Sequence, residues 1–163
     1  MDKAACNHRR REKDFAACSA YSLPTLRKRL MNMPIIGVGT DIVEVERIRR
    51  IVEKYSGFAE RVFTRSELEY CLPKSSRYLH LAARFAAKEA VAKSLGSSFS
   101  WHEVEIINNI NGKPEVVLHR RAKEAASGAI VHISLSHTRN YACAVAVVEV
   151  KECGYPLTDH QNN

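Results

Sequence analysis

The longest unbroken apolar run in this 163-residue chain, Tyr141 to Val148, places the strongest constraint on its fold. The run and the residues that follow it predict a β-strand over 141–150. Because successive side chains of a strand point to opposite faces, both faces of this strand are apolar. We therefore expect it to lie at the centre of a sheet, covered on both sides. The run is far shorter than the roughly 20 apolar residues needed to cross a bilayer, so we expect no membrane segment.

The remaining elements mix helices and strands without regular alternation, which predicts an α+β fold. A capping-box pattern from Thr64 to Glu67 begins one short helix. An Ala-rich periodic stretch that stops at Gly96 predicts a longer helix. The predicted strands cover residues 35–39, 104–108, 115–118, 131–136 and 141–150, and the predicted helices cover 43–56, 65–72, 78–95 and 120–126.

Most of the net charge of +7 belongs to the N-terminal part of the chain. Residues 1–33 carry eight Lys and Arg against three Asp and Glu and lack a long periodic apolar run. We expect them to form a poorly ordered basic extension, residues 34–150 to form one domain, and residues 151–163 to form a flexible tail. The charge suggests one alternative, a basic nucleic-acid-binding domain without catalysis, but no RNP, KH or zinc-finger signature accompanies it.

The cysteines are five in number and include no Cys-x-x-Cys pair. An odd count without metal-ligand spacing favours reduced thiols over a disulfide framework or a zinc site. Reduced thiols are typical of the cytoplasm, and we expect the protein to work there.

Asp41 is the first candidate functional residue. It follows a short apolar strand in which Gly37 and Gly39 allow another backbone to come close, and strand ends often carry functional groups. The alternative is that Asp41 caps the helix after it. Ile42 stands where a dinucleotide-binding fingerprint needs its third glycine, so the Gly-x-Gly pair does not predict such a site.

The segment from Arg84 to Lys93 carries cations and a carboxylate at helical spacing. Arg84 and Lys88 lie four residues apart, as do Glu89 and Lys93, so these side chains occupy neighbouring helix faces between small alanines. The alternative is an ordinary surface helix with one ion pair between Glu89 and Lys93.

Two further segments carry polar groups that could bind a ligand. Lys113 lies in a hairpin turn between Gly112 and Pro114, but the rest of a phosphate-binding Walker loop is missing. His137 lies at the end of a strand and faces the opposite way from His132, which argues against a shared metal. The alternatives are a solvated turn lysine and a hydrogen-bonded histidine at a strand end.

Together these groups suit phosphoryl-type transfer. The carboxylates of Asp41 and Glu89 are too few to enclose Ca²⁺, but they suit Mg²⁺, which takes one or two carboxylates together with substrate phosphates and water. The cations available for a phosphorylated ligand are Arg84, Lys88, Lys93 and Lys113. In such reactions positioning and charge neutralisation supply most of the catalysis.

Several segments occur in the order and spacing found in holo-acyl-carrier-protein synthases, the small trimeric bacterial type of 4′-phosphopantetheinyl transferase, and about residues 34–150 resemble that family. The matching segments are Gly37–Arg47, Phe58–Arg61, Thr64–Leu68, Arg84–Ala90, Asn111–Pro114 and Ser134–Thr138. The resemblance implies a small antiparallel sheet packed with a long helix, assembled as a homotrimer with active sites between subunits. It also implies Mg²⁺-dependent transfer of the 4′-phosphopantetheine group from coenzyme A to a serine of apo-acyl carrier protein. Adenosine 3′,5′-bisphosphate would leave.

The resemblance also implies roles for individual residues. Asp41 and Glu89 match the metal ligands, and with Lys93 they match the catalytic residues, Glu89 helping to deprotonate the serine. The implied coenzyme A contacts are Arg84, Lys88, Lys93, Gly112, Lys113, Pro114, Ser136, His137 and Thr138. The implied contacts of the acidic carrier protein, on the first helix, are Arg47, Arg50 and Lys54. The resemblance implies neither a nucleic acid nor a membrane as partner.

Overall fold

The structure is a computed structural model that describes residues 35–150, so the predicted extension at 1–33 and the predicted tail at 151–163 lie outside the described residues. The elements in chain order are β1 (Ile35–Glu44), α2 (Val45–Lys54), α3 (Phe58–Val62), α4 (Arg65–Cys71), α5 (Arg77–Ser94), a 3-10 helix (Trp101–Glu103), β2 (Val104–Asn108), β3 (Pro114–Leu118), α6 (Arg120–Ala126), β4 (Ile130–His137) and β5 (Tyr141–Glu149). This mixture of helices and strands confirms the α+β class.

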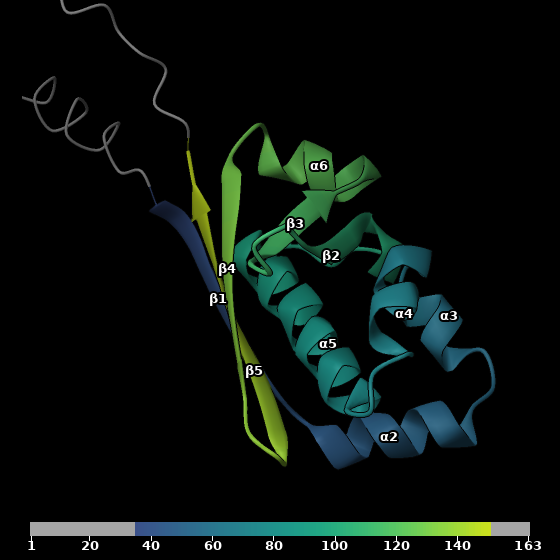
Figure 1. The fold of residues 1–163 in the computed structure, drawn as a ribbon. Helices are drawn as coiled ribbons and strands as arrows, with labels where there is room; N and C mark the ends of the chain where they lie inside the picture. The colour runs from purple at the N-terminus through teal and green to yellow at the C-terminus, as the bar shows by residue number, and fades with distance from the viewer. Residues whose placement is uncertain (1–34, 151–163) are drawn as a thin grey trace, which may run out of the picture. The chain divides into compact units, whose positions relative to one another are not determined.

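Strand β5 is the central strand of a three-stranded antiparallel sheet with the order β1-β5-β4, as its apolar sequence predicts. β2 and β3 form a separate antiparallel hairpin. Helix α5 lies between the three-stranded sheet on one side and α4 with the β2–β3 hairpin on the other (Figure 1). The small antiparallel sheet packed with one long helix is therefore confirmed.

The core between α5 and the sheet is built from small side chains. Alanines of both elements are at most 1% exposed, and their small size lets the helix approach the sheet closely. These alanines are Ala82, Ala86, Ala87 and Ala90 of α5 and Ala142, Ala144 and Ala146 of β5.

The opposite face of the sheet is open within the described chain. Val38 and Ile42 of β1 are 64% and 67% exposed, and Val145 of β5 is 41% exposed. The prediction that β5 is covered on both sides is therefore wrong for this single chain, because α5 packs on only one of the two apolar faces. An exposed apolar face of this kind is typical of a protein–protein contact.

Strand β1 runs further than its sequence predicts. Asp41 lies within the strand, paired with Ala144 of β5, and pairing continues to Glu44. Glu44, not Asp41, is the N-cap residue of α2, so the interpretation of Asp41 as a helix cap is wrong. Pairing with a long neighbouring strand has extended β1 over residues whose local pattern favours a helix start.

Helix α4 begins where the capping box predicts. The backbone N–H of Glu67 donates to Thr64 Oγ1 at 3.3 Å, and the backbone N–H of Thr64 donates to Glu67 Oε2 at 2.7 Å. The predicted helices over 78–95 and 120–126 are present as α5 and α6. Neither of the two one-turn helices was predicted: α3 has no such local signal, whereas the 3-10 helix has one that was missed, a capping box in which the backbone N–H of Ser100 donates to Glu103 Oε2 at 2.8 Å.

No helix between residues 35 and 150 has the length and hydrophobicity needed to cross a bilayer. The two cysteines of this region, Cys71 and Cys143, both carry free thiols. Burial raises the pKa of the Cys71 thiol to about 11, so this thiol stays protonated and unreactive at neutral pH.

Candidate active site

Asp41 and Lys93 meet where β1 crosses α5. The Lys93 ammonium donates to Asp41 Oδ1 at 2.8 Å and to the Thr40 carbonyl at 2.9 Å. Gly39 makes this approach possible, because a Cβ there would lie 2.1 Å from the Ala90 carbonyl oxygen of α5. The predicted close backbone approach at this glycine is present and brings two residues 52 positions apart into contact.

Glu89 lies one turn before Lys93 on α5 and adds a second carboxylate to this group. The hydrogen bond to Asp41 raises the pKa of the Lys93 ammonium, and the negative charges of Asp41 and Glu89 raise it further against the opposing effect of partial burial. Lys93 is half exposed, so it remains cationic and accessible at neutral pH. Glu89 also lines a 90 Å³ cavity between α5 and the segment 98–104.

The surface-helix interpretation of the segment Arg84 to Lys93 is wrong. Arg84 and Lys88 are 3% and 2% exposed. Lys93 forms its ion pair with Asp41 on another element, and no ion pair with Glu89 occurs among the residues that the structure describes. The segment therefore faces the interior and the candidate site.

Lys88 is a structural cation. Its ammonium lies 2.9 Å from Glu67 Oε2 and donates to the carbonyl oxygens of Trp101, at 2.7 Å, and of Val104. These three contacts use all three N–H groups of the lysine. The placement does not fit the predicted contact between Lys88 and coenzyme A, because a buried ammonium with no donor left cannot reach a phosphate.

Arg84 is buried but incompletely satisfied. Its Nη2 donates to Asn108 Oδ1 at 2.7 Å, and its guanidinium carbon lies 4.2 Å from the centre of the Tyr70 ring. Its Nε is buried without a hydrogen-bond partner within the described chain. The guanidinium therefore keeps one donor that the described residues leave unused, which is costly for a buried group.

His137 at the end of β4 joins a cluster of aromatic and cationic side chains. Its ring lies 6.4 Å from that of His80, which packs edge-on against Tyr70 at 5.9 Å. Burial lowers the pKa of His80, and the nearby charges of Lys74, Arg84 and His137 lower it further. His80 was not predicted from the sequence, although its position four residues before Arg84 on one helix puts both on the same face.

The remaining predicted ligand contacts lie in two turns. Gly112 has a φ of +79°, which glycine adopts readily, and Lys113 lies between it and Pro114, the first residue of β3. Lys113 lines a pocket of 320 Å³ whose lining includes none of Asp41, Glu89 and Lys93.

Near the end of β4, Ser136 is paired with Cys143 of β5, and in the turn that follows Thr138 Oγ1 accepts from the backbone N–H of Tyr141 at 3.2 Å. Among residues 35–150, no hydrogen bond or ion pair links the Lys113 pocket or this turn to the Asp41–Lys93 group.

Helix α2 carries the three predicted carrier-protein contacts. Arg50 interacts weakly with Glu46, with 3.9 Å between Nε and Oε1. Arg47 and Lys54 form no ion pair among the residues that the structure describes, and both are exposed. These two cations are therefore available to a partner.

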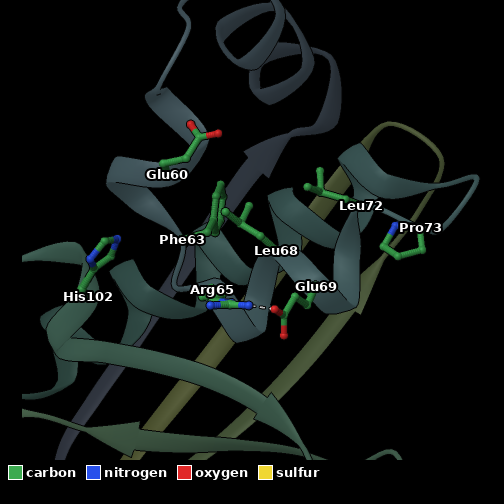
Figure 2. A pocket seen from close by; sticks show the side chains of 8 residues that line it. All are labelled: Glu60, Phe63, Arg65, Leu68, Glu69, Leu72, Pro73 and His102. Carbon is green, nitrogen blue, oxygen red and sulfur yellow. Dashed lines mark hydrogen bonds and ion pairs between the residues drawn. The ribbon is translucent and has the colours of Figure 1, made fainter.

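Another pocket, of 460 Å³, lies between α3, α4 and the 3-10 helix (Figure 2). Its wall is mainly apolar, and none of the predicted site residues lines it. Arg65 and Glu69 at its edge are paired with each other at 2.8 Å, which neutralises both charges. It does not resemble a site for a phosphorylated ligand.

The donor set around Lys93 is compatible with a hard divalent cation. No cluster of three or more His, Cys, Asp or Glu occurs between residues 35 and 150. Instead, the carboxylates of Asp41 and Glu89 both lie near the Lys93 ammonium and raise its pKa. Two carboxylates fit Mg²⁺, which completes its shell with phosphate and water oxygens.

The family model of the 4′-phosphopantetheinyl transferase superfamily matches residues 37–146. Among curated proteins, the holo-[acyl-carrier-protein] synthase of Caldanaerobacter subterraneus is 51% identical over 118 residues, which span 69% of this chain and 93% of that protein. The protein of the same name from Protochlamydia amoebophila is 47% identical over 117 residues, spanning 69% and 96%.

Solved structures agree with these matches. The holo-acyl-carrier-protein synthase of Plasmodium yoelii superposes with a TM-score of 0.65 at 35% identity, covering 72% of this chain and 96% of that one. The Bacillus anthracis protein, solved in complex with coenzyme A (3′,5′-ADP), has a TM-score of 0.63 at 33% identity, covering 72% and 99%.

Proposed function

The chain belongs to the 4′-phosphopantetheinyl transferase superfamily, and from this premise we propose that it acts as a holo-acyl-carrier-protein synthase. It transfers the 4′-phosphopantetheine group of coenzyme A to a serine hydroxyl of apo-acyl carrier protein and releases adenosine 3′,5′-bisphosphate. The observation that carries this proposal is the contact of Asp41 with Lys93, one helical turn from Glu89. The family assignment replaces the alternative of a nucleic-acid-binding domain.

In this reaction one bond forms and one bond breaks at the same phosphorus atom. The serine oxygen attacks the phosphorus that bears the pantetheine arm, and the bond from that phosphorus to the oxygen of adenosine 3′,5′-bisphosphate breaks. The serine proton passes to the Glu89 carboxylate. The Lys93 ammonium, kept cationic by its raised pKa, neutralises the charge that develops on the leaving phosphate.

Asp41 and Glu89 are the proposed ligands of Mg²⁺, which when bound would neutralise the diphosphate oxygens of coenzyme A. Asp41 has a second role, because its hydrogen bond orients the Lys93 ammonium. Removing the metal with a chelator should therefore abolish transfer, and added Mg²⁺ should restore it.

The proposed coenzyme A contacts keep all the predicted residues except Lys88, which is fully engaged inside the protein. The unpartnered Nε of Arg84 supports an anionic ligand beside it. The kept contacts are Arg84, Lys93, Gly112, Lys113, Pro114, Ser136, His137 and Thr138. For the acidic carrier protein we keep Arg47, Arg50 and Lys54, which lie on the exposed helix α2.

A homotrimer is the proposed assembly. The open apolar sheet face, with Val38, Ile42 and Val145, supports a contact between copies. The separate pocket beside Lys113 supports an active site completed by a neighbouring subunit. We place the catalytic domain at residues 34–150 and the reaction in fatty acid biosynthesis in the cytoplasm, which the free thiols of Cys71 and Cys143 support.

The test follows the release of adenosine 3′,5′-bisphosphate from coenzyme A by chromatography, with apo-acyl carrier protein and Mg²⁺ present. Asp41→Asn and Glu89→Gln should each lower the rate about 100-fold or more, because each removes a charge at the reacting phosphates. Glu124→Gln on α6 is the matched control and should keep the full rate. No release by the unaltered protein, or full activity of both site variants, would contradict the proposal.

A further inference from the structure

Asn108, the last residue of β2, makes a hydrogen bond with each of two neighbouring elements. Its Oδ1 accepts from Arg84 Nη2 on α5 at 2.7 Å. Its Nδ2 donates to the Gly112 carbonyl oxygen at 2.8 Å. The two ends of one amide thus link the buried arginine to the turn that precedes β3.

The position of the Arg84 guanidinium depends on few contacts. Arg84 is 3% exposed and stacks on Tyr70, and within residues 35–150 its side chain makes one hydrogen bond, the one to Asn108. Its Nε has no partner within the described chain. Asn108 therefore supplies the side-chain hydrogen bond that, together with the contact with Tyr70, sets the orientation of the guanidinium.

The turn is rigid in itself but projects into solvent. Asn109 Oδ1 accepts from the backbone N–H groups of Asn111 and Lys113, both at 3.0 Å, which closes the turn on itself. Ile110 at its tip is fully exposed. Since the tip is not packed against any residue that the structure describes, the direction in which the turn points depends on bonds at its base, such as the one from Asn108 to Gly112.

We propose that Asn108 is a positioning residue that couples Arg84 to the turn over 109–113 and so fixes the relative placement of Arg84 and Lys113. This inference rests on the proposed function for the identity of the ligand, coenzyme A, whose phosphates both cations would contact. Held in place beforehand, the two cations lose less conformational freedom when the ligand binds. Asn108 touches neither the ligand nor the reacting atoms in this account.

The test compares two substitutions of Asn108 in the full chain. Asn108→Ala removes both hydrogen bonds. Asn108→Asp keeps an acceptor for Arg84 but places an oxygen against the Gly112 carbonyl, so the turn is released while the arginine stays paired. In both variants we expect the amide hydrogens of Gly112 and Lys113 to exchange about fivefold faster or more, the factor expected for loss of one typical hydrogen bond.

Kinetics supply the second measurement. In both variants the KM for coenzyme A should rise about fivefold while kcat and the KM for the carrier protein change less than twofold. Asn111→Asp is the control, because it adds the same charge to the same turn at a side chain for which no hydrogen bond is described. An equal rise of KM in this control, or wild-type amide exchange in Asn108→Asp, would overturn the inference.

The exchange measurement needs no activity. If the unaltered protein transfers nothing, the proposed function fails, and the exchange rates still decide whether Asn108 holds the turn. If transfer is normal and the exchange rates of both Asn108 variants match the wild type, the inference alone fails.

Discussion

Replacing Gly39 by alanine should separate β1 from α5. A Cβ at this position would lie 2.1 Å from the Ala90 carbonyl oxygen, 2.6 Å from the Ser94 nitrogen and 3.0 Å from the Lys93 Cβ. Two of these three atoms belong to the helix backbone, which cannot rotate away. The strand itself must therefore move outward.

The size of the effect follows from the overlap. Ordinary van der Waals contact at this site begins at 3.4 Å, so the Cβ and the Ala90 oxygen overlap by about 1.3 Å. Overpacking of a buried site costs about 1–3 kcal/mol, and we expect about 3 kcal/mol here because the partner atoms are backbone. Asp41, two residues further along β1, would move away from Lys93, and a misplacement of about 1 Å can lower a catalytic rate about 100-fold.

Urea unfolding and the transfer rate together test this account. Gly39→Ala should unfold at a lower urea concentration and, where still folded, transfer about 100-fold more slowly. Gly57→Asn is the control for the clash: a Cβ there meets no atom within 4 Å, and asparagine adopts the positive φ of 79° at less cost than other residues with a side chain, so this variant should keep the transfer rate. If Gly39→Ala were as stable and as active as the wild type, close approach of strand and helix would not be what assembles the site.

Three further perturbations test other parts of the structure. Lys88→Met should lower the free energy of unfolding by about 3–5 kcal/mol, because it leaves the buried Glu67 carboxylate without its cation. The double variant Glu67→Gln, Lys88→Met should recover most of this lost stability in urea unfolding. No recovery would contradict a mutual ion pair. Val145→Asp should convert the proposed trimer to monomers in analytical ultracentrifugation, whereas an unchanged trimer would place the interface elsewhere. Asp41 raises the pKa of Lys93 in the folded state. Their pairing therefore stabilises the folded state fully at pH values below the unfolded pKa of lysine, about 10.4, and this contribution is lost as the pH rises through the higher folded pKa. The stabilities of the wild type and Asp41→Asn, measured by urea unfolding, should therefore converge at alkaline pH, and a constant difference between them would be evidence against the pair.

Local signals in the sequence predicted the elements that depend on them. The capping box at Thr64 and Glu67 and the alanine periodicity before Gly96 indicated α4 and α5. The end of β1 was not predicted, because its pairing partners in β5 lie about 100 residues later in the chain. Tertiary pairing overrode the local helical pattern there.

In the candidate site, too, some features could be predicted from local sequence and others depend on distant contacts. Gly39 and Asp41 could be singled out from the sequence as a close approach beside a carboxylate, and the structure contains that approach. The role of Lys88 could not be read from its own helix, because its burial depends on Glu67 of α4. Asn108 carries no motif, and its importance comes only from lying between Arg84 and a turn.

We propose above all that this chain attaches a phosphopantetheine group to a carrier protein. The most direct measurement is the intact mass of apo-acyl carrier protein after incubation with this protein, coenzyme A and Mg²⁺. We expect a gain of about 340 Da, the approximate mass of one covalently attached phosphopantetheinyl group, and no gain when the carrier serine is replaced by alanine. An unchanged carrier mass with the unaltered protein, or an equal gain without the serine, would contradict it.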